Sequence, residues 1–259
     1  MRRALWALLV LSLARTHGPD RTLTVFAAAS LTEAFTELGD LLRAHDPGVV
    51  VQFNFAGSQL LALQLIEGAE ADVFAAADVR SMQAVADSGL VDDPIPFARN
   101  RLVVILPATN PARIAALRDL ARPGVKIVLA GDAVPAGRYA RAVVANLGRS
   151  PGFPPAYEHR VLANVVSEEE NVRAVVAKVR LGEADAGIVY ASDVSAAAGG
   201  GVRTLVIPDS ANVLATYPIA VLHRSTHQAA ARAFVALVFS PAGQRVLARH
   251  GLLPIAGRP

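Results

Sequence analysis

The sequence predicts an α/β protein of two lobes, each a mixed, mainly parallel sheet flanked by helices. Short apolar runs typical of buried strands alternate with segments of helical periodicity along most of the chain. This alternation indicates βα units. Pro94-x-Pro96 interrupts it before the apolar run 101–106, and we interpret the interruption as a crossing into a second lobe. With 259 residues, of which 53 % are hydrophobic, the chain can bury a large core.

The N-terminus has the pattern of a secretory signal peptide. A basic pair, Arg2-Arg3, precedes an apolar run over residues 4–14 that is too short to anchor the chain in a bilayer and that ends in a Ser-x-Ala pattern. We therefore expect residues 1–20 to be a signal peptide with a short leader, and the mature protein to be periplasmic.

Charge and cysteine content argue against several classes of protein. Removing residues 1–14 removes two arginines and no acid, so the formal charge falls from +3 to +1. The remaining arginines are scattered along the chain, so we expect no nucleic-acid partner. Because the sequence has no Cys, disulfides, thiolate catalysis and Cys-ligated metals are excluded. A protein of this size without disulfides is compatible with a bacterial periplasm.

The first strand-to-helix junction follows the leader. Residues 22–27 form an apolar run with the composition of a buried strand, and apolar residues then recur every three or four positions over 31–42, as in an amphipathic helix. Ser30 stands where the N-cap of this helix is expected. The start of a helix attracts anions through its unpaired N–H groups and its dipole. Ser30 is therefore either a helix cap or part of an anion site.

A second and a third junction repeat this arrangement. We expect strands over 49–55 and 71–77, followed by helices over 60–66 and up to residue 85. Ser58 lies at the second junction, as Ser30 does at the first. Ligands of such sheets gather at the carboxyl ends of the strands, where both serines are expected.

The rest of the chain continues the alternation. In the second lobe we expect strands over 125–130, 160–165, 186–190 and 205–208, with helices over 139–147 and 172–181. A return strand over 216–222 and two terminal helices over 229–239 and 241–250 complete the first lobe.

Acidic residues occur near several of these junctions. Asp72, Asp78, Asp185 and Asp193 are expected at strand ends or helix starts, where capping explains them. Glu168-Glu169-Glu170 is expected at the start of the helix over 172–181, where acids interact favourably with the helix dipole.

Signals of catalysis are weak. Ser58 lacks the second glycine of a nucleophile elbow, and no histidine pair has metal-ligand spacing in a suitable context. A hydrolase that uses Ser58 or Ser30 would need a histidine within hydrogen-bond reach, and none lies near either serine in the sequence. We therefore do not expect an enzyme.

The junctions instead favour a site made of hydrogen-bond donors. Backbone N–H groups, serine hydroxyls and a tyrosine hydroxyl can all donate to an oxyanion. A site without carboxylate acceptors penalises a protonated anion, because the O–H group of that anion would find no partner. Such a site would favour a fully deprotonated tetrahedral dianion over hydrogen phosphate.

Six motifs in order carry a family resemblance. They are Val25-Phe26-Ala27-Ala28-Ala29-Ser30-Leu31, Phe55-Ala56-Gly57-Ser58, Ala71-Asp72-Val73-Phe74 with Ala77-Asp78, Val134-Pro135-Ala136-Gly137 with Tyr139-Ala140, Asn171-Val172-Arg173, and Gly187-Ile188-Val189-Tyr190-Ala191-Ser192-Asp193. With these motifs the chain resembles the periplasmic molybdate-binding proteins of bacterial ABC importers over essentially all of its mature length.

The resemblance implies a two-lobed type II periplasmic-binding fold with the ligand in the cleft between the lobes. Lobe I would comprise residues 21–99 plus 218–259, and lobe II residues 100–217. The ligand-binding residues implied are the hydroxyls and amides of Ser30 and Ser58, the backbone N–H groups of Ala136 and Val172, and the hydroxyl of Tyr190. Molybdenum would be bound as the oxyanion, with no side chain coordinating the metal.

The function implied is capture of molybdate, and of tungstate, for delivery to a membrane ABC permease. No cofactor is expected, and we expect the protein to be a monomer. The alternative is the same fold with another oxyanion, sulfate or phosphate, or with ferric iron. Iron would need carboxylates or tyrosines that converge in the cleft.

Overall fold

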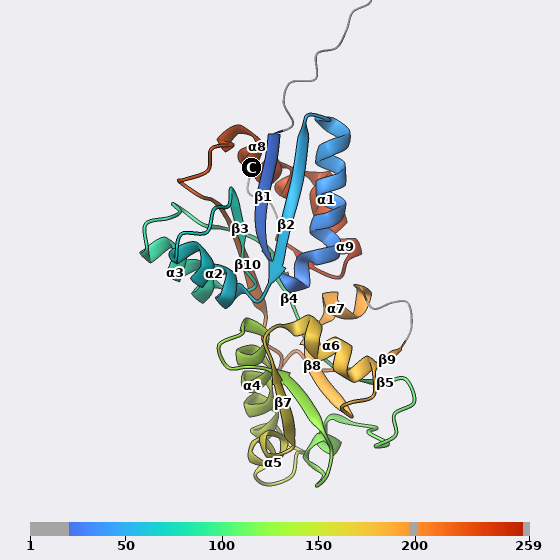
Figure 1. The fold of residues 1–259 in the computed structure, drawn as a ribbon. Coiled ribbons are helices and arrows are strands. Elements are labelled where there is room, and N and C mark those ends of the chain that lie inside the picture. Colours follow the sequence, from blue (N-terminus) through green and yellow to red (C-terminus); the bar gives the residue numbers. More distant parts are fainter. Residues whose placement is uncertain (1–20, 197–200, 256–259) are drawn as a thin grey trace, which may run out of the picture.

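The computed structural model describes residues 21–196 and 201–255, which form two lobes (Figure 1). The predicted signal peptide, residues 1–20, lies outside the described residues. Each lobe consists of one mixed sheet with helices packed against it, which confirms the predicted α/β class. Among the described strands, two of five pairings in the first sheet and two of four in the second are parallel, so the sheets are mixed but not mainly parallel. Within the described residues, no helix combines the length and the apolar character needed to cross a membrane.

The sheet of the first lobe has the strand order β11-β4-β10-β3-β1-β2. Its strands are β1 (Arg21–Ala28), β2 (Val49–Ala56), β3 (Val73–Ala75), β4 (Ile95–Asn100), β10 (Ala215–Val221) and β11 (Leu253–Pro254). Strand β1 pairs in parallel with β2 and β3, while β10 pairs antiparallel with β3 and β4. The ends of β1, β2 and β3 therefore lie together at one edge, as βα units require.

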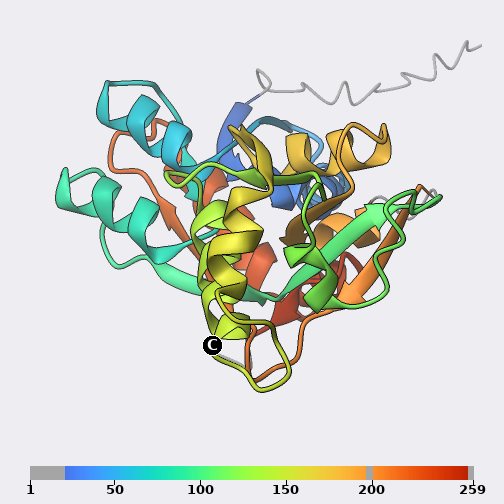
Figure 2. The ribbon, with the colours of Figure 1, turned by 90° about the horizontal axis from the view of Figure 1, so that it is seen from below.

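Helices cover both faces of this sheet. They are α1 (Thr32–His45), α2 (Ser58–Ile66), α3 (Val79–Asp87), α8 (Gln228–Phe239) and α9 (Pro241–Arg249), with a 3-10 turn η1 (Ala29–Leu31) before α1. Figures 1 and 2 show α2 and α3 on the flank opposite α1. On the α1 face, Phe35 and Phe234 pack edge to face with ring centroids 5.5 Å apart. The α2 face has its own apolar cluster, which includes Leu61, Phe74 and Met82.

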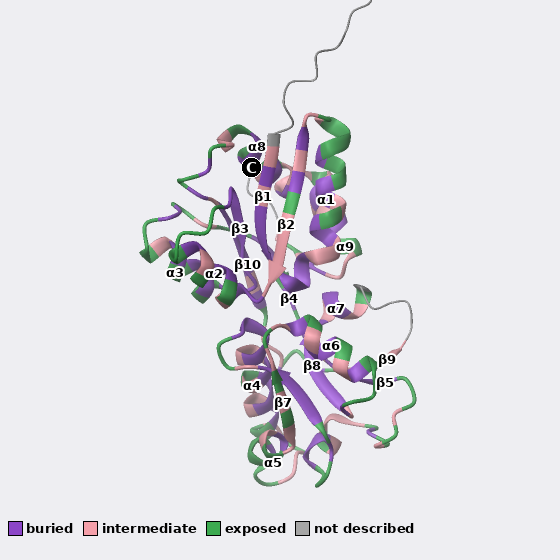
Figure 3. Cartoon of the chain, viewed as in Figure 1, coloured by how far each residue is buried: buried purple, intermediate pink, exposed green. Residues whose placement is uncertain are grey.

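The sheet of the second lobe has the order β7-β6-β8-β5-β9. Its strands are β5 (Leu102–Pro107), β6 (Ile127–Ala130), β7 (Val165–Glu169), β8 (Ala186–Tyr190) and β9 (Val202–Val206). Its helices are η2 (Leu117–Ala121), α4 (Pro135–Gly148), α5 (Tyr157–Ala163), α6 (Val172–Arg180) and α7 (Ala191–Ala196). Strands β6 and β8 are buried along their whole length, and the outer faces of the helices are exposed (Figure 3).

Two chain segments connect the sheets. Strand β4 ends at Asn100 and β5 begins at Leu102. Eight residues, 207–214, separate the end of β9 at Val206 from the start of β10, which returns to the first sheet. Strand β10 begins at Ala215, three residues before the predicted lobe boundary at residue 218, and Asn100 pairs with Ala215 in the first sheet. The exact division into lobes stays a prediction.

One predicted strand is a helix. Residues 157–163 form α5, and strand β7 follows at Val165–Glu169, so the strand predicted at 160–165 is wrong. The four-residue spacing of Tyr157 and Val161 places both side chains in the core, and the Tyr157 hydroxyl donates to the Leu117 carbonyl at 2.7 Å. Glu168 and Glu169 consequently lie in a strand and not at a helix start.

Strand β4 was not expected, because Pro96 removes a backbone donor from the ladder. The structure accommodates this proline beside an irregularity. Pro96 lies opposite Pro218 of β10, and the register shifts between Tyr217 and Pro218. The two residues without N–H groups thus face each other where the ladder is interrupted.

Candidate functional site

The two lobes enclose a small cavity where strand ends and helix starts from both sheets meet. Its volume is about 10 Å³, counted as the space that the centre of a water-sized sphere can reach. This is close to the minimum volume that holds one water molecule. The described residues that line it are Ala28, Ala29, Ser30, Ala56, Gly57, Ser58, Ala77, Val134, Pro135, Ala136, Asn171, Val172 and Tyr190. None of these residues is charged. All five predicted site residues, Ser30, Ser58, Ala136, Val172 and Tyr190, are among them.

Three helices begin at this cavity. The N-cap residues of α2, α4 and α6 are Gly57, Val134 and Asn171, and only Asn171 caps its helix with its side chain, by accepting from the Ala174 amide at 3.1 Å. The first four N–H groups of a helix have no partner within it. The amides in the first turns of α2 and α4 are therefore available to an acceptor, and the helix dipoles add partial positive charge.

Glycine is required where α4 begins. A Cβ on Gly137 would overlap the carbonyl oxygens of Gly131 and Ala130, because the first turn of α4 packs directly on the end of β6. This close approach brings the amide of Ala136 to the cavity wall. Pro135 at the first helical position has no N–H to leave unpaired.

Ser58 is almost completely buried, with 1 % of its surface exposed. Its hydroxyl oxygen accepts from the amide of Ala77 at 2.9 Å. Because that contact uses a lone pair, the hydroxyl hydrogen remains free to donate. Ser58 thus both joins α2 to the end of β3 and presents a donor to the cavity.

Ser30 does not cap α1, contrary to its expected N-cap position. Helix α1 begins at Thr32, its N-cap residue is Leu31, and no side chain caps it. The 3-10 turn over 29–31 moves the helix start by one residue, and Ser30 lies buried within that turn. There its hydroxyl lies 2.9 Å from that of Tyr217.

Tyr217 belongs to a buried network that links both lobes. The Asn100 side-chain amide donates to the Ser192 hydroxyl at 2.8 Å and contacts the Tyr217 hydroxyl at 3.3 Å. Asn100 and Tyr217 lie on β4 and β10, beside the two connections between the sheets, while Ser192 lies on α7 of the second lobe. The network therefore positions Ser30 relative to the two connections between the sheets.

Tyr190 has a buried hydroxyl without a hydrogen-bond partner among the described residues. Its ring packs edge to face against Tyr139 and Tyr217, with centroids 6.5 and 5.7 Å away. Burial, with Tyr217 and Tyr139 nearby, raises the pKa of Tyr190 well above its ordinary value, so the hydroxyl stays protonated at neutral pH. A buried polar group left unpaired costs about 1–3 kcal/mol. An acceptor in the cavity would remove that cost.

The acidic residues near the cavity are paired or buried. Asp78 caps α3 by accepting from the Ser81 amide at 3.0 Å, as predicted, and forms an ion pair with Arg138. One carboxylate oxygen of Asp193 accepts from the Tyr190 amide at 3.0 Å, and burial raises the pKa of Asp193 to about 7. Glu169 pairs with Lys178 at 2.7 Å, and Glu168 pairs with Arg141.

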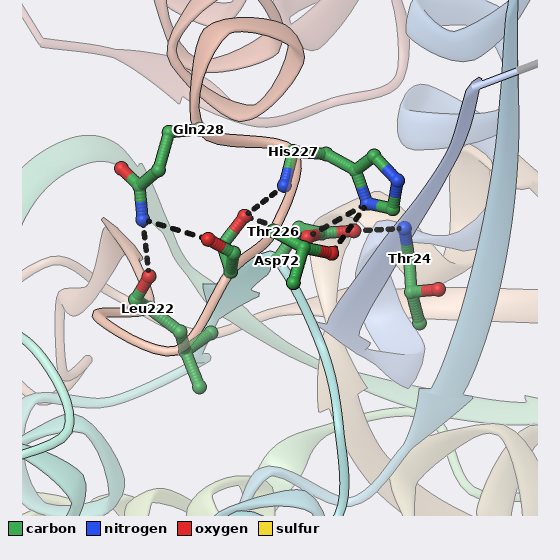
Figure 4. A network of polar contacts seen from close by, with 7 residues as sticks. Thr24, Asp72, Leu222, Thr226, His227 and Gln228 are labelled. Atoms are coloured by element: carbon green, nitrogen blue, oxygen red, sulfur yellow. Dashed lines mark hydrogen bonds and ion pairs between the residues drawn. The ribbon is translucent and has the colours of Figure 1, made fainter.

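Asp72 has a structural role that capping does not describe. It accepts hydrogen bonds from the Thr24 amide at 2.7 Å and the Ser225 hydroxyl at 2.6 Å, and His227 contacts it at 3.4 Å (Figure 4). These contacts join β1 to the turn before α8. Asp72 does not line the interlobe cavity.

Known proteins share this sequence and fold. The family model of bacterial extracellular solute-binding proteins matches residues 23–253. The molybdate-binding protein ModA of Mycobacterium tuberculosis H37Rv is 44 % identical over 232 residues, which cover 89 % of this chain and 84 % of that protein. ModA of Escherichia coli K12 is 32 % identical over 242 residues, covering 88 % of each.

A solved structure extends the likeness to the fold. The periplasmic molybdate-binding protein of Azotobacter vinelandii superposes with a TM-score of 0.74 at 19 % identity, covering 90 % of this chain and 99 % of that one. At this identity the likeness concerns the fold alone. Together, the family model and the relatives above 30 % identity establish that the chain belongs to the bacterial extracellular solute-binding proteins.

Proposed function

We propose that this protein captures molybdate between its two lobes and delivers it to an ABC permease. The observation that carries the proposal is the unpartnered, buried hydroxyl of Tyr190 in a cavity lined by uncharged residues and by the starts of helices from both lobes. The relatives named molybdate-binding protein ModA, at 44 % and 32 % identity, support the choice of ligand.

The donors expected to hold the anion come from both lobes. Ser30 and Ser58 would donate from the first lobe, and the backbone N–H groups of Ala136 and Val172 and the hydroxyl of Tyr190 from the second. A tetrahedral oxyanion offers each of them an acceptor oxygen. Because no carboxylate from residues 21–196 and 201–255 lines the cavity, a protonated anion would keep an unpaired O–H group. The site therefore favours a fully deprotonated dianion, such as molybdate or tungstate, over hydrogen phosphate.

Binding would stabilise the closed arrangement of the lobes. An anion that accepts hydrogen bonds from both lobes has more partners when the lobes are together, so it shifts the population toward the closed state. The two connections beside Asn100 and Tyr217 are the natural hinge for this motion. A closed monomer with bound anion, located in the periplasm, would be the form that the permease recognises.

Three alternatives make different demands on the cavity. Sulfate is also a tetrahedral dianion, and size would separate it from molybdate. Ferric iron prefers oxygen ligands that carry negative charge. No group of three His, Cys, Asp or Glu side chains among the described residues could hold a metal ion, and Tyr190 is the one tyrosine that lines the cavity. A hydrolase would need a histidine near Ser30 or Ser58, and no histidine of the described residues lines the cavity.

Thermal unfolding of the mature protein with molybdate, tungstate, sulfate or phosphate tests this proposal. A ligand at about 100 times its Kd stabilises the native state by about 2.7 kcal/mol. We expect molybdate and tungstate to raise Tm by several degrees at concentrations where sulfate and phosphate leave it unchanged. A rise with sulfate alone, or with phosphate alone, would move the function to that ligand.

A further inference from the structure

The first turn of α4 forms an ion pair with the opposite lobe. The Arg138 guanidinium contacts the Asp78 carboxylate, and its other nitrogen donates to the carbonyls of Asp132 at 3.2 Å and Ala133 at 2.5 Å. Arg138 therefore binds both the turn before α4 and a residue at the start of α3. The contact is mostly shielded from water, with 4 % of the Asp78 side chain and 24 % of the Arg138 side chain exposed.

Asp78 is fixed next to the cavity. It directly follows Ala77, which lines the cavity and donates its amide to Ser58. The other carboxylate oxygen of Asp78 accepts from the Ser81 amide, so the side chain cannot turn away without leaving α3 uncapped. A buried negative charge at this place would repel an incoming dianion unless a cation compensates it.

We propose that Arg138 is a positioning residue that controls the affinity of the cavity for an anion. It does so by neutralising the charge of Asp78 and by holding the start of α4 against the first lobe. Arg138 does not line the cavity and need not touch the anion. It acts through Asp78 and through the first turn of α4, which contains Ala136. The inference rests on the proposed function, because it presumes that the cavity takes an oxyanion.

A second ion pair between the lobes is more exposed to solvent than the pair of Arg138 and Asp78. Arg173 of α6 contacts Glu33 of α1 at 2.6 Å, with 43 % and 30 % of the two side chains exposed. Solvent screens such a pair, and exposed pairs contribute little to stability. The burial of Asp78 beside the cavity is therefore what singles out Arg138.

The test measures molybdate affinity and dissociation rate for Arg138→Met, Asp78→Asn and the double variant. We expect Arg138→Met to bind at least about tenfold more weakly, mainly through faster dissociation, because Asp78 is left charged and unpaired. The double variant removes that charge, and Asn keeps the cap of α3. It should therefore bind at least about threefold more tightly than Arg138→Met.

Arg249→Met is the matched control. Arg249 pairs with Glu37 within the first lobe, so its loss removes an arginine ion pair without affecting the cavity, and affinity should stay within about twofold of wild type. If Arg138→Met does not fold by circular dichroism, Arg138→Gln is measured against the same thresholds.

Two results would overturn the inference. One is affinity of Arg138→Met within twofold of wild type. The other is a double variant as weak as Arg138→Met, because a purely structural role for Arg138 would not be relieved by Asp78→Asn. Failure of the wild type to bind molybdate would instead overturn the proposed function, so the two failures are distinguishable.

Discussion

The hydroxyl oxygens of Ser30 and Tyr217 lie 2.9 Å apart in the protein interior, although 187 residues separate them in the sequence. Burial raises the pKa of Tyr217 far above its ordinary value, so the tyrosine remains a hydroxyl at neutral pH. Because each hydroxyl can donate and accept, Tyr217 can hold Ser30 in the orientation that presents its remaining hydrogen-bonding capacity to the cavity.

Tyr217→Phe should weaken molybdate binding by about three- to tenfold, because it removes a hydrogen bond worth about 0.5–1.5 kcal/mol that orients Ser30. Calorimetric titration measures the change. Tyr157→Phe is the control, since the Tyr157 hydroxyl is also bonded, to the Leu117 carbonyl, but lies away from the cavity. A similar loss of affinity in both variants would show that the effect is not specific to Ser30.

Gly137→Ala should destabilise the protein by about 2 kcal/mol or more and weaken anion binding, because the new Cβ would overlap the Gly131 and Ala130 carbonyl oxygens. Gly148 of the same helix is the matched control. A Cβ there meets no atom closer than 3.5 Å, so Gly148→Ala should be neutral or stabilising. Urea unfolding of the two variants compares them. Equal free energies of unfolding would contradict the close packing of α4 on β6.

Asp193 should make stability depend on pH. Burial raises the pKa of its carboxyl from 3.8 to about 7, and Glu33 adds to the rise, while the Tyr190 amide and Arg173 oppose it. Between about pH 4 and pH 7 the native state therefore binds more protons than the unfolded state. It follows that this group's contribution to stability falls as pH rises through that window, by up to about 4 kcal/mol.

The Asp193→Asn variant isolates this effect. Asparagine keeps an acceptor for the Tyr190 amide and cannot ionise. We expect the free energy of unfolding of the variant to exceed that of wild type increasingly as pH rises from 5 to 8, with the difference smallest at the acid end. Unfolding curves whose difference is constant over this range would contradict a raised pKa of Asp193.

Tyr190→Phe should retain the fold and lose affinity for molybdate by about tenfold, because the ring stays packed while the donor to the anion is gone. In the absence of ligand the variant should be as stable as wild type or more stable, since the unpaired buried hydroxyl is removed. The combination of higher stability and lower affinity separates a binding role from a structural one. Unchanged affinity would remove Tyr190 from the proposed site.

The sequence predicts much of this architecture because its signals are local. The strand-to-helix alternation places Ser30 and Ser58 at strand ends, and both line the cavity. The junction that contains Ala136 also follows from the alternation, between the strand over 125–130 and the helix over 139–147. Val172 follows from the family resemblance alone, because a backbone N–H donor leaves no side-chain signal. The position of Ser30 as a helix cap is wrong because a 3-10 turn, which has no strong sequence signal, precedes α1.

Contacts between distant residues could not be predicted in the same way. The hydrogen bonds of Tyr217 with Ser30 and Asn100 form because strand β10 returns beside β4. Strand β4 is not predicted from the sequence, because Pro96 argues against a strand there. The pairing of Arg138 with Asp78 spans 60 residues and both lobes. Tyr217 is a polar aromatic residue in a mainly apolar strand, which is the one local signal that could have identified it.

Isothermal titration of the mature wild-type protein with molybdate, followed by sulfate and phosphate, tests the central claim most directly. The account predicts tight one-to-one binding of molybdate and little heat with the other two anions, because hydrogen phosphate would keep an unpaired O–H group in the cavity and sulfate is separated from molybdate by its size. Absence of heat with molybdate, together with clear binding of sulfate or phosphate, would contradict it.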